Sequence, residues 1–145
     1  MDLKETIRSI PDWPIKGVIF RDLTTLMQNP LTFKKSCDIL YDRYKDMSID
    51  KIVGIDARGF VFGAVLAYKL GIGFIPVRKK GKLPWKTIQE TYSLEYGEDT
   101  LEIHEDAVEK GEKVVIVDDL IATGGTVGAT VKLVKKLEAQ IIECA

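Results

Sequence analysis

The sequence predicts an α/β protein with a mostly parallel central sheet flanked by helices. Short apolar stretches alternate with segments of helical period. The apolar stretches lack the strict alternation of half-exposed strands, which is typical of strands covered on both faces. Unusual polar residues follow three of these stretches directly, at the edge where open parallel sheets bind ligands. The predicted architecture therefore already indicates where a site should lie.

The length and composition predict one soluble domain over residues 1–145. Hydrophobic residues make up 46% and charged residues 30%, and the formal net charge of -1 gives no reason to expect nucleic acid or a membrane as partner. The first ten residues contain no apolar signal core, and two widely spaced cysteines suit reduced thiols. We therefore expect a cytoplasmic location.

The elements are expected in a regular order. They are a short amphipathic helix over 1–10, an extended piece at 17–20, a helix from Pro30 to about Tyr44, strands at 51–56, 71–77 and 113–119, apolar and amphipathic helices at 59–68 and 125–137, and the start of a strand at 140–145. Because the chain stops inside an apolar strand, we expect it to be truncated at its C-terminus.

One stretch, Arg78 to Ile103, interrupts this alternation. It is polar, contains Pro84 and has no helical period, while Tyr92, Leu94 and Tyr96 alternate as in a strand. We expect a flexible arm or hairpin, at about residues 79–100, inserted between two core strands. With few apolar anchors, the arm is expected to be mobile without ligand and to close over the site as a lid.

The stretch VVIVDDLIATGGT, residues 114–126, joins an apolar strand to a glycine-rich loop that opens a helix. Gly124 and Gly125 carry no side chain, so a phosphate can approach the backbone amides. Thr123 and Thr126 add hydroxyl donors, and the helix dipole favours an anion there. The pattern predicts a phosphate-binding loop that is neither a Walker A loop nor a G-x-G-x-x-G loop.

Asp118 and Asp119 come just before that loop. They would repel a phosphate in direct contact, but they suit hydroxyl groups or a hydrated Mg²⁺ beside it. A ribose 5-phosphate carries both a phosphate and a 2,3-diol, so the acids are expected on the diol and the loop on the phosphate. The alternatives are a pair that merely caps the helix, and a nucleotide-hydrolase metal site, which would need a P-loop elsewhere in the sequence.

The same stretch resembles the 5-phosphoribosyl 1-diphosphate (PRPP) motif of type I phosphoribosyltransferases. FRDLT at 20–24, IDARGF at 55–60, and RKKGKLP with YSLEYG between 78 and 97 resemble the adenine-specific branch, in the same order along essentially the whole chain. The resemblance implies that fold and a pentosyltransferase that moves the phosphoribosyl group from PRPP to adenine. The products would be AMP and pyrophosphate, a step of purine salvage.

The resemblance also implies roles for individual residues. PRPP would be bound by Asp118, Asp119, Ala122, Thr123, Gly124, Gly125, Thr126, Ala57, Arg58, Arg78 and Lys82. The base pocket would be lined by Ile19, Phe20 and Arg21. The catalytic residues would be Arg58, which neutralises the diphosphate, and Glu95 and Tyr96, which fold over the reacting centre. Glu95 is the candidate for handling purine protonation, and Asp56–Ala57 is the place where this family usually has a cis peptide.

The implied cofactor is Mg²⁺, held mainly by the diphosphate of the substrate with Asp118 and Asp119 nearby. The implied assembly is a homodimer, in which Arg78 and Lys82 could reach the diphosphate of the same or the other subunit. Two alternatives are a phosphoribosyltransferase for another base, such as xanthine, hypoxanthine or orotate, and a non-catalytic regulator that senses PRPP. The FRDLT and YSLEYG segments favour adenine, and no added DNA-binding domain or basic face supports a regulator.

Overall fold

The structure, a computed structural model, describes residues 2–94, 96–119 and 124–145. The chain divides into two compact units, Met1–Arg43 and Tyr44–Ala145. The candidate phosphate loop and acid pair belong to the second unit, and the candidate base-pocket residues belong to the first. That the whole chain behaves as one domain stays a prediction.

The first unit begins differently from the sequence expectation. Only η1 (Leu3–Thr6) is helical within the described part of the first ten residues, and β1 (Arg8–Pro11) pairs with β2 (Ile19–Asp22) in an antiparallel hairpin. The predicted helix over 1–10 is therefore wrong. Its apolar spacing is overridden by cross-strand pairing, in which Ile10 lies opposite Phe20. Two helices follow the hairpin, α1 (Thr24–Gln28) and the expected α2 (Pro30–Tyr44).

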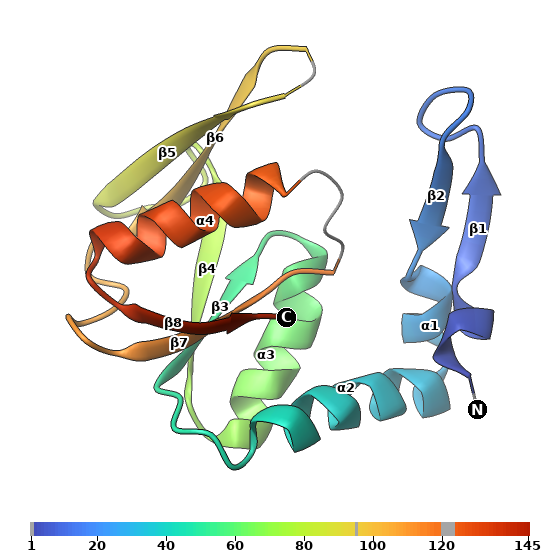
Figure 1. The fold of residues 1–145 in the computed structure, drawn as a ribbon, viewed down its shortest axis with the longest axis horizontal. Coiled ribbons are helices and arrows are strands. Elements are labelled where there is room, and N and C mark those ends of the chain that lie inside the picture. The colour runs from blue at the N-terminus through green and yellow to red at the C-terminus, as the bar shows by residue number, and fades with distance from the viewer. Residues whose placement is uncertain (1, 95, 120–123) are drawn as a thin grey trace. The chain divides into compact units, whose positions relative to one another are not determined.

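The second unit contains a six-stranded sheet in the order β5-β6-β4-β3-β7-β8 (Figure 1). The strands are β3 (Lys51–Ile55), β4 (Gly73–Lys79), β5 (Thr87–Ser93), β6 (Glu98–His104), β7 (Lys113–Val117) and β8 (Gln140–Cys144). The four strands β4, β3, β7 and β8 are parallel, whereas β6 is antiparallel to both β4 and β5. The predicted mostly parallel sheet is confirmed.

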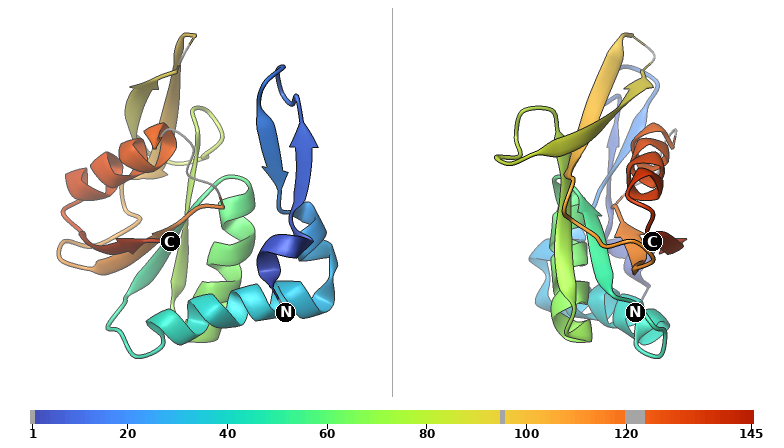
Figure 2. Two further views of the ribbon diagram at one scale, coloured as in Figure 1. Left: turned by 45° about the vertical axis from the view of Figure 1, so that its right-hand side comes forward. Right: turned by 90° about the vertical axis from the view of Figure 1, so that its left-hand side faces the viewer.

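Two helices cover opposite faces of this sheet, α3 (Arg58–Leu70) and α4 (Gly125–Lys136) (Figure 2). Side-chain alternation along β3 explains the arrangement. Ile52 lies under α3, since a Cβ at Gly63 would come 3.5 Å from it, while Val53 and Ile55 join the buried cluster that includes Leu133 of α4. Within the described ranges, no helix is long and apolar enough to cross a bilayer.

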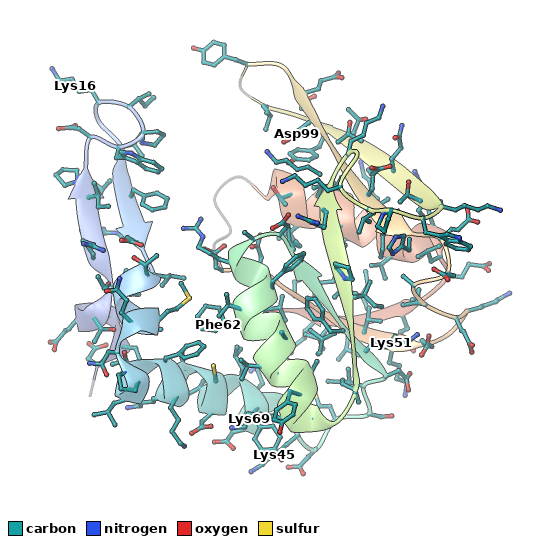
Figure 3. All side chains as sticks on the ribbon, turned by 180° about the vertical axis from the view of Figure 1, so that it is seen from behind. Lys16, Lys45, Lys51, Phe62, Lys69 and Asp99 are labelled. Atoms are coloured by element: carbon teal, nitrogen blue, oxygen red, sulfur yellow. The ribbon has the colours of Figure 1, made fainter. Side chains whose placement is uncertain are left out.

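The expected arm is a β5–β6 hairpin that extends past the end of α4 (Figure 1). It continues the sheet, because β6 pairs with the last two residues of β4. Ile88 and Tyr92 of β5 pack against the core cluster, so the arm has more apolar anchors than the sequence suggested. Asp99, labelled in Figure 3, pairs with Lys79 Nζ at 2.9 Å and ties the hairpin to β4.

Candidate active site

β7 brings two adjacent carboxylates to the edge where the parallel strands end. Residues 114–117 are buried, and Asp118 and Asp119 follow them directly. Asp119 N donates to Asp118 Oδ1 at 2.8 Å. The Asp119 carboxylate, with a side chain 8% exposed, pairs with Arg58 Nε at 2.6 Å. Three residues that the sequence placed in one site therefore do lie together.

Asp118 has an unusual ionisation. Burial raises the pKa of its carboxyl to about 6, and the neighbouring Asp119 carboxylate also raises it, while Arg58 opposes the shift. The carboxylate is therefore predominantly charged at pH 7, but it takes up a proton in mildly acidic solution. Such an acid in a ligand-binding edge is a candidate functional group.

Gly59, in the first turn of α3, allows that helix to approach the acid pair. A Cβ on this residue would lie 2.7 Å from the Val117 carbonyl oxygen and 3.4 Å from Asp118 Oδ1. Only glycine fits without a shift of the backbone. Sequence reasoning did not single out Gly59, although it follows the charged turn Asp56–Arg58 at the start of an apolar helix.

The turn between β3 and α3 carries a cis peptide bond between Asp56 and Ala57, as the family resemblance implies. Asp56 N donates to the carbonyl of Val77 at 3.0 Å, which fixes the turn against β4. Arg58 is the first residue of α3. Asp56 was not among the predicted site residues.

Asp56 forms ion pairs with two of the predicted basic residues. Arg78 Nε lies 3.0 Å and Lys82 Nζ lies 3.9 Å from Asp56 Oδ2. Arg78 also donates through Nη1 to the carbonyl of Lys82 at 3.5 Å. Arg78 and Lys82 thus lie beside the Asp56–Ala57 turn of their own chain, and a reach across a dimer interface stays a prediction.

The glycine-rich loop leads into α4. Gly124 has a positive φ of 82°, which glycine adopts without strain, and Gly128 N donates to its carbonyl at 2.8 Å. Thr126 Oγ1 lies 3.5 Å from the hydroxyl of Tyr92 on β5. Helix α4 thus begins immediately beyond the acid-pair loop, as expected for an anion site. Ala122 and Thr123 lie outside the described residues.

Comparisons with known proteins decide the family. A family model described as a phosphoribosyl transferase domain matches residues 22–145. An adenine phosphoribosyltransferase of Desulfosudis oleivorans is 67% identical over 145 residues, which is 100% of this chain and 84% of that protein. The chain belongs to the adenine phosphoribosyltransferase family.

Two solved structures of adenine phosphoribosyltransferases carry informative ligands. The enzyme of Saccharomyces cerevisiae, complexed with adenine and an imino-altritol bisphosphate, is 41% identical with a TM-score of 0.90, covering 99% of this chain and 86% of that one. The enzyme of Trypanosoma brucei, in complex with AMP, pyrophosphate and ribose 5-phosphate, is 31% identical with a TM-score of 0.89, covering 98% and 63%. Membership of the adenine phosphoribosyltransferase family makes this chain a pentosyltransferase that forms AMP from adenine and PRPP, and it argues against another base or a regulator.

Two catalytic candidates of the adenine phosphoribosyltransferase pattern remain, of which the structure describes Tyr96, at the turn of the β5–β6 hairpin. Leu94 N donates to the carbonyl of Gly97 at 2.9 Å and closes the turn. Tyr96 is 89% exposed, and Glu95 lies outside the described residues. Their roles over the reacting centre stay predictions.

The predicted base-pocket residues lie on β2 in the first unit. Ile19 is 57% exposed, and the ring of Phe20 meets Trp13 edge-on, with centroids 4.6 Å apart. Arg21 donates through Nη1 to the hydroxyl of Ser9. An exposed aliphatic side chain beside an aromatic ring suits a flat purine, but the role of these three residues stays a prediction.

Proposed function

We propose that this chain transfers the phosphoribosyl group to adenine at the carboxyl edge of β3 and β7. The observation that supports this location best is the acid pair Asp118–Asp119, which follows β7 directly and whose Asp119 carboxylate pairs with Arg58 Nε at 2.6 Å. Carboxylates that suit sugar hydroxyls and cations that suit phosphate oxygens therefore lie at one edge, where they pair with one another as Asp119–Arg58 and Asp56–Arg78. A sugar that carries a phosphate at each end offers partners to both kinds of group.

The ribose 5-phosphate part would be held by β7 and α4. Asp118 and Asp119 accept hydrogen bonds from the 2- and 3-hydroxyls. The 5-phosphate lies in the loop, where Gly124, Gly125 and Thr126 begin the helix, together with Ala122 and Thr123. The backbone amides and the helix dipole stabilise the dianion without a lysine.

The diphosphate would lie at the turn of Ala57 and Arg58. In the structure, the Arg78 and Lys82 cations are held by Asp56. A bound diphosphate offers them additional negative oxygens, so both can turn to the substrate while Asp56 limits their range. Charged donors held close to the turn would stabilise the departing diphosphate.

The reaction is a displacement at the anomeric carbon. An adenine ring nitrogen forms the new bond while the bond to the diphosphate oxygen breaks, and the electron pair leaves with the diphosphate. The sugar passes through an oxocarbenium-like state, as in glycoside cleavage. Ile19, Phe20 and Arg21 would hold the base, Glu95 would receive the purine proton, and Tyr96 would help to exclude water.

Mg²⁺ is part of the proposal. Within the described ranges, no three acidic, histidine or cysteine side chains form a metal cluster. Asp118 and Asp119 supply two carboxylates, which suits Mg²⁺ bound mostly by water and substrate oxygens. When bound, the ion would neutralise charge on the diphosphate.

We also infer a cytoplasmic homodimer, from the family resemblance. Light scattering coupled to gel filtration tests the assembly. A monomer at assay concentrations would contradict it.

The decisive experiment offers single bases together with PRPP and Mg²⁺. We expect AMP and pyrophosphate from adenine, and at most trace products from hypoxanthine, xanthine or orotate. Product separation by chromatography gives both identity and rate. A turnover with another base equal to that with adenine would overturn the proposed specificity, and product formed without PRPP would overturn the reaction.

A further inference from the structure

Glu102 is a charged residue in the interior of the second unit. It lies in the middle of β6 between buried Leu101 and Ile103, and it is itself 8% exposed. A carboxylate is rarely buried at such a position without donors. Glu102 has two, because Oε1 accepts from Gly81 N at 2.6 Å and Oε2 accepts from Thr87 Oγ1 at 2.6 Å.

These two bonds hold both ends of the loop that joins β4 to β5. The loop turns at Gly81, whose φ is +87°, and Lys82 N donates to the carbonyl of Lys79 at 3.3 Å. Lys80 N donates to the carbonyl of Thr100 on β6 at 3.1 Å. The Glu102 side chain therefore fixes a loop that backbone hydrogen bonds and the long Arg78–Lys82 contact hold otherwise.

The same loop carries one cation of the site, Lys82, and follows directly after the end of β4, which carries another, Arg78. Lys82 follows Gly81 directly, and its Nζ lies 3.9 Å from Asp56 Oδ2. Arg78 is paired opposite Glu102 in the β4–β6 ladder and donates to the Lys82 carbonyl. A shift of the Gly81 amide would thus move Lys82 first and Arg78 second.

We propose that Glu102 is a positioning residue for the diphosphate end of PRPP, which acts through Gly81 and Lys82 without touching the substrate. This inference rests on the proposed function, in which Lys82 and Arg78 bind the diphosphate. Glu102 then affects binding of one substrate group, the diphosphate. The ribose and the 5-phosphate are bound by residues at the end of β7 and the start of α4.

The chemistry of the side chain supports this role. Hydrogen bonds from Thr87 and from the Gly81 amide hold the pKa of Glu102 below its ordinary value, so the group is a carboxylate at neutral pH. A carboxylate accepts from both donors with a charged oxygen, whereas glutamine offers one neutral oxygen and one NH2 group, which can contact Thr87 only by donating to its hydroxyl. Glu102→Gln therefore keeps the volume of the side chain but removes the charge that strengthens both of its hydrogen bonds to the loop.

Binding of two ligands separates a positioning role from a general structural one. Ribose 5-phosphate lacks the diphosphate, whereas PRPP carries it. For Glu102→Gln we expect PRPP to bind about tenfold more weakly, as for one lost charged contact, and ribose 5-phosphate to bind as in the wild type. Calorimetry measures both constants, and the exposed Glu105→Gln, just beyond β6, is the matched control that should change neither.

A double-mutant cycle tests whether the effect passes through Lys82. Lys82→Ala alone should weaken PRPP binding about tenfold, and adding Glu102→Gln to it should cause no further loss, since coupled residues are not additive. Thr87 gives a second way to loosen the same attachment if Glu102→Gln does not fold. Thr87→Val should reproduce the loss of PRPP affinity, and Thr87→Ser, which keeps the hydroxyl, should restore it.

Two outcomes would overturn the positioning role. They are an equal loss of affinity for both ligands, which indicates a general structural effect, and full additivity with Lys82→Ala. The failure of the proposed function is distinguishable, because the wild-type protein itself would then fail to bind PRPP.

Discussion

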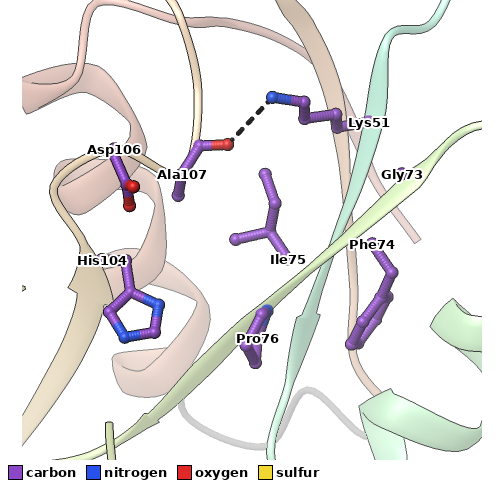
Figure 4. Close-up of a pocket in the computed structure, with 8 residues that line it drawn as sticks. All are labelled: Lys51, Gly73, Phe74, Ile75, Pro76, His104, Asp106 and Ala107. Carbon is purple, nitrogen blue, oxygen red and sulfur yellow. Dashed lines mark hydrogen bonds between the residues drawn. The ribbon is translucent and has the colours of Figure 1, made fainter. Parts of the chain in front are cut away.

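The two edges of the parallel sheet shift the pKa values of their carboxylates in opposite directions. At the edge where β3 begins, Lys51 Nζ donates to Glu112 Oε1 at 2.9 Å and to the carbonyl of Ala107 at 3.1 Å, beside a hollow of about 250 Å³ (Figure 4). The Glu109 amide and the Lys51 ammonium hold the pKa of Glu112 below its ordinary value. At the other edge, burial raises the pKa of Asp118.

The difference shows which edge is built for a ligand. Glu112 is satisfied by its own chain, and its charge stabilises the fold. Asp118 is desolvated beside a second carboxylate, so its charge is not fully compensated within the protein. The hydroxyls of a bound sugar would supply the missing donors, and polar groups arranged at a cost to stability are typical of active sites.

The largest effect is expected from removal of both charges at the ligand edge. Asp118→Asn together with Asp119→Asn should lower kcat/KM for PRPP by about 10³-fold or more, because both diol acceptors lose their charge. Steady-state kinetics measures the loss, and circular dichroism confirms the fold. Nearly unchanged turnover in a folded double variant would show that Asp118 and Asp119 do not bind the ribose hydroxyls. The two edges would then not differ in function.

A second test shifts the position of Asp118 and Asp119 without substituting either residue. In Gly59→Ala, the new Cβ would lie 2.7 Å from the Val117 carbonyl, so α3 or the end of β7 must shift. We expect turnover to fall by about 10²-fold, as for a misplacement of about 1 Å, with a stability loss of about 1–3 kcal/mol.

Gly128→Ala in α4 is the control for Gly59→Ala, because nothing lies within 4 Å of its Cβ. It should leave turnover unchanged and stabilise the helix by up to about 1 kcal/mol. Equal turnover of the Gly59→Ala variant and the wild type would show that the close approach of α3 does not position the acids.

A third test uses pH. Since the pKa of folded Asp118 is raised to about 6, its charge is lost as pH falls through that value, and PRPP affinity should drop about tenfold per pH unit below it. The effect on stability has the opposite sign. The folded state binds this proton more tightly than the unfolded state, so the stabilising effect of protonation is lost as pH rises through about 6.

The dissociation constant of PRPP, measured from pH 5 to 8, checks the pH effect. The variant Asp118→Asn is the control for protonation of PRPP itself and should show a flatter profile. If the pH profiles of the wild type and of Asp118→Asn superimpose, Asp118 does not titrate in this range.

The smallest effect is expected at the opposite edge. Lys51→Met should lower the free energy of unfolding by about 1 kcal/mol or less and leave turnover unchanged, because its ion pair with Glu112 is partly exposed and remote from the acids. Urea unfolding and steady-state kinetics measure the two quantities. A loss of turnover in a variant that is still folded under the assay conditions would show that the two edges are coupled.

The sequence predicted what depends on local pattern. The apolar run before Asp118 and the glycine pair at the start of α4 can be recognised from their spacing, so the sequence alone was enough to place the acid pair at a strand end and the glycines at a helix start. Asp56, Gly59 and Glu102 were missed because their importance comes from neighbours far along the chain, Arg78, Val117 and Gly81. The helix expected over 1–10 failed for the same reason, since pairing with β2 decides its conformation.

The order of the strands has a consequence for how the protein folds. The β5–β6 hairpin joins neighbours in sequence, and such hairpins form within microseconds. The pairing of β3 with β7, which sets Lys51 opposite Val114, must close the chain around that hairpin and belongs to the slow, non-local class. Arg58 and Asp119 meet only when this pairing is complete. Catalytic competence should therefore be the last property to return on refolding, after the far-UV signal has recovered.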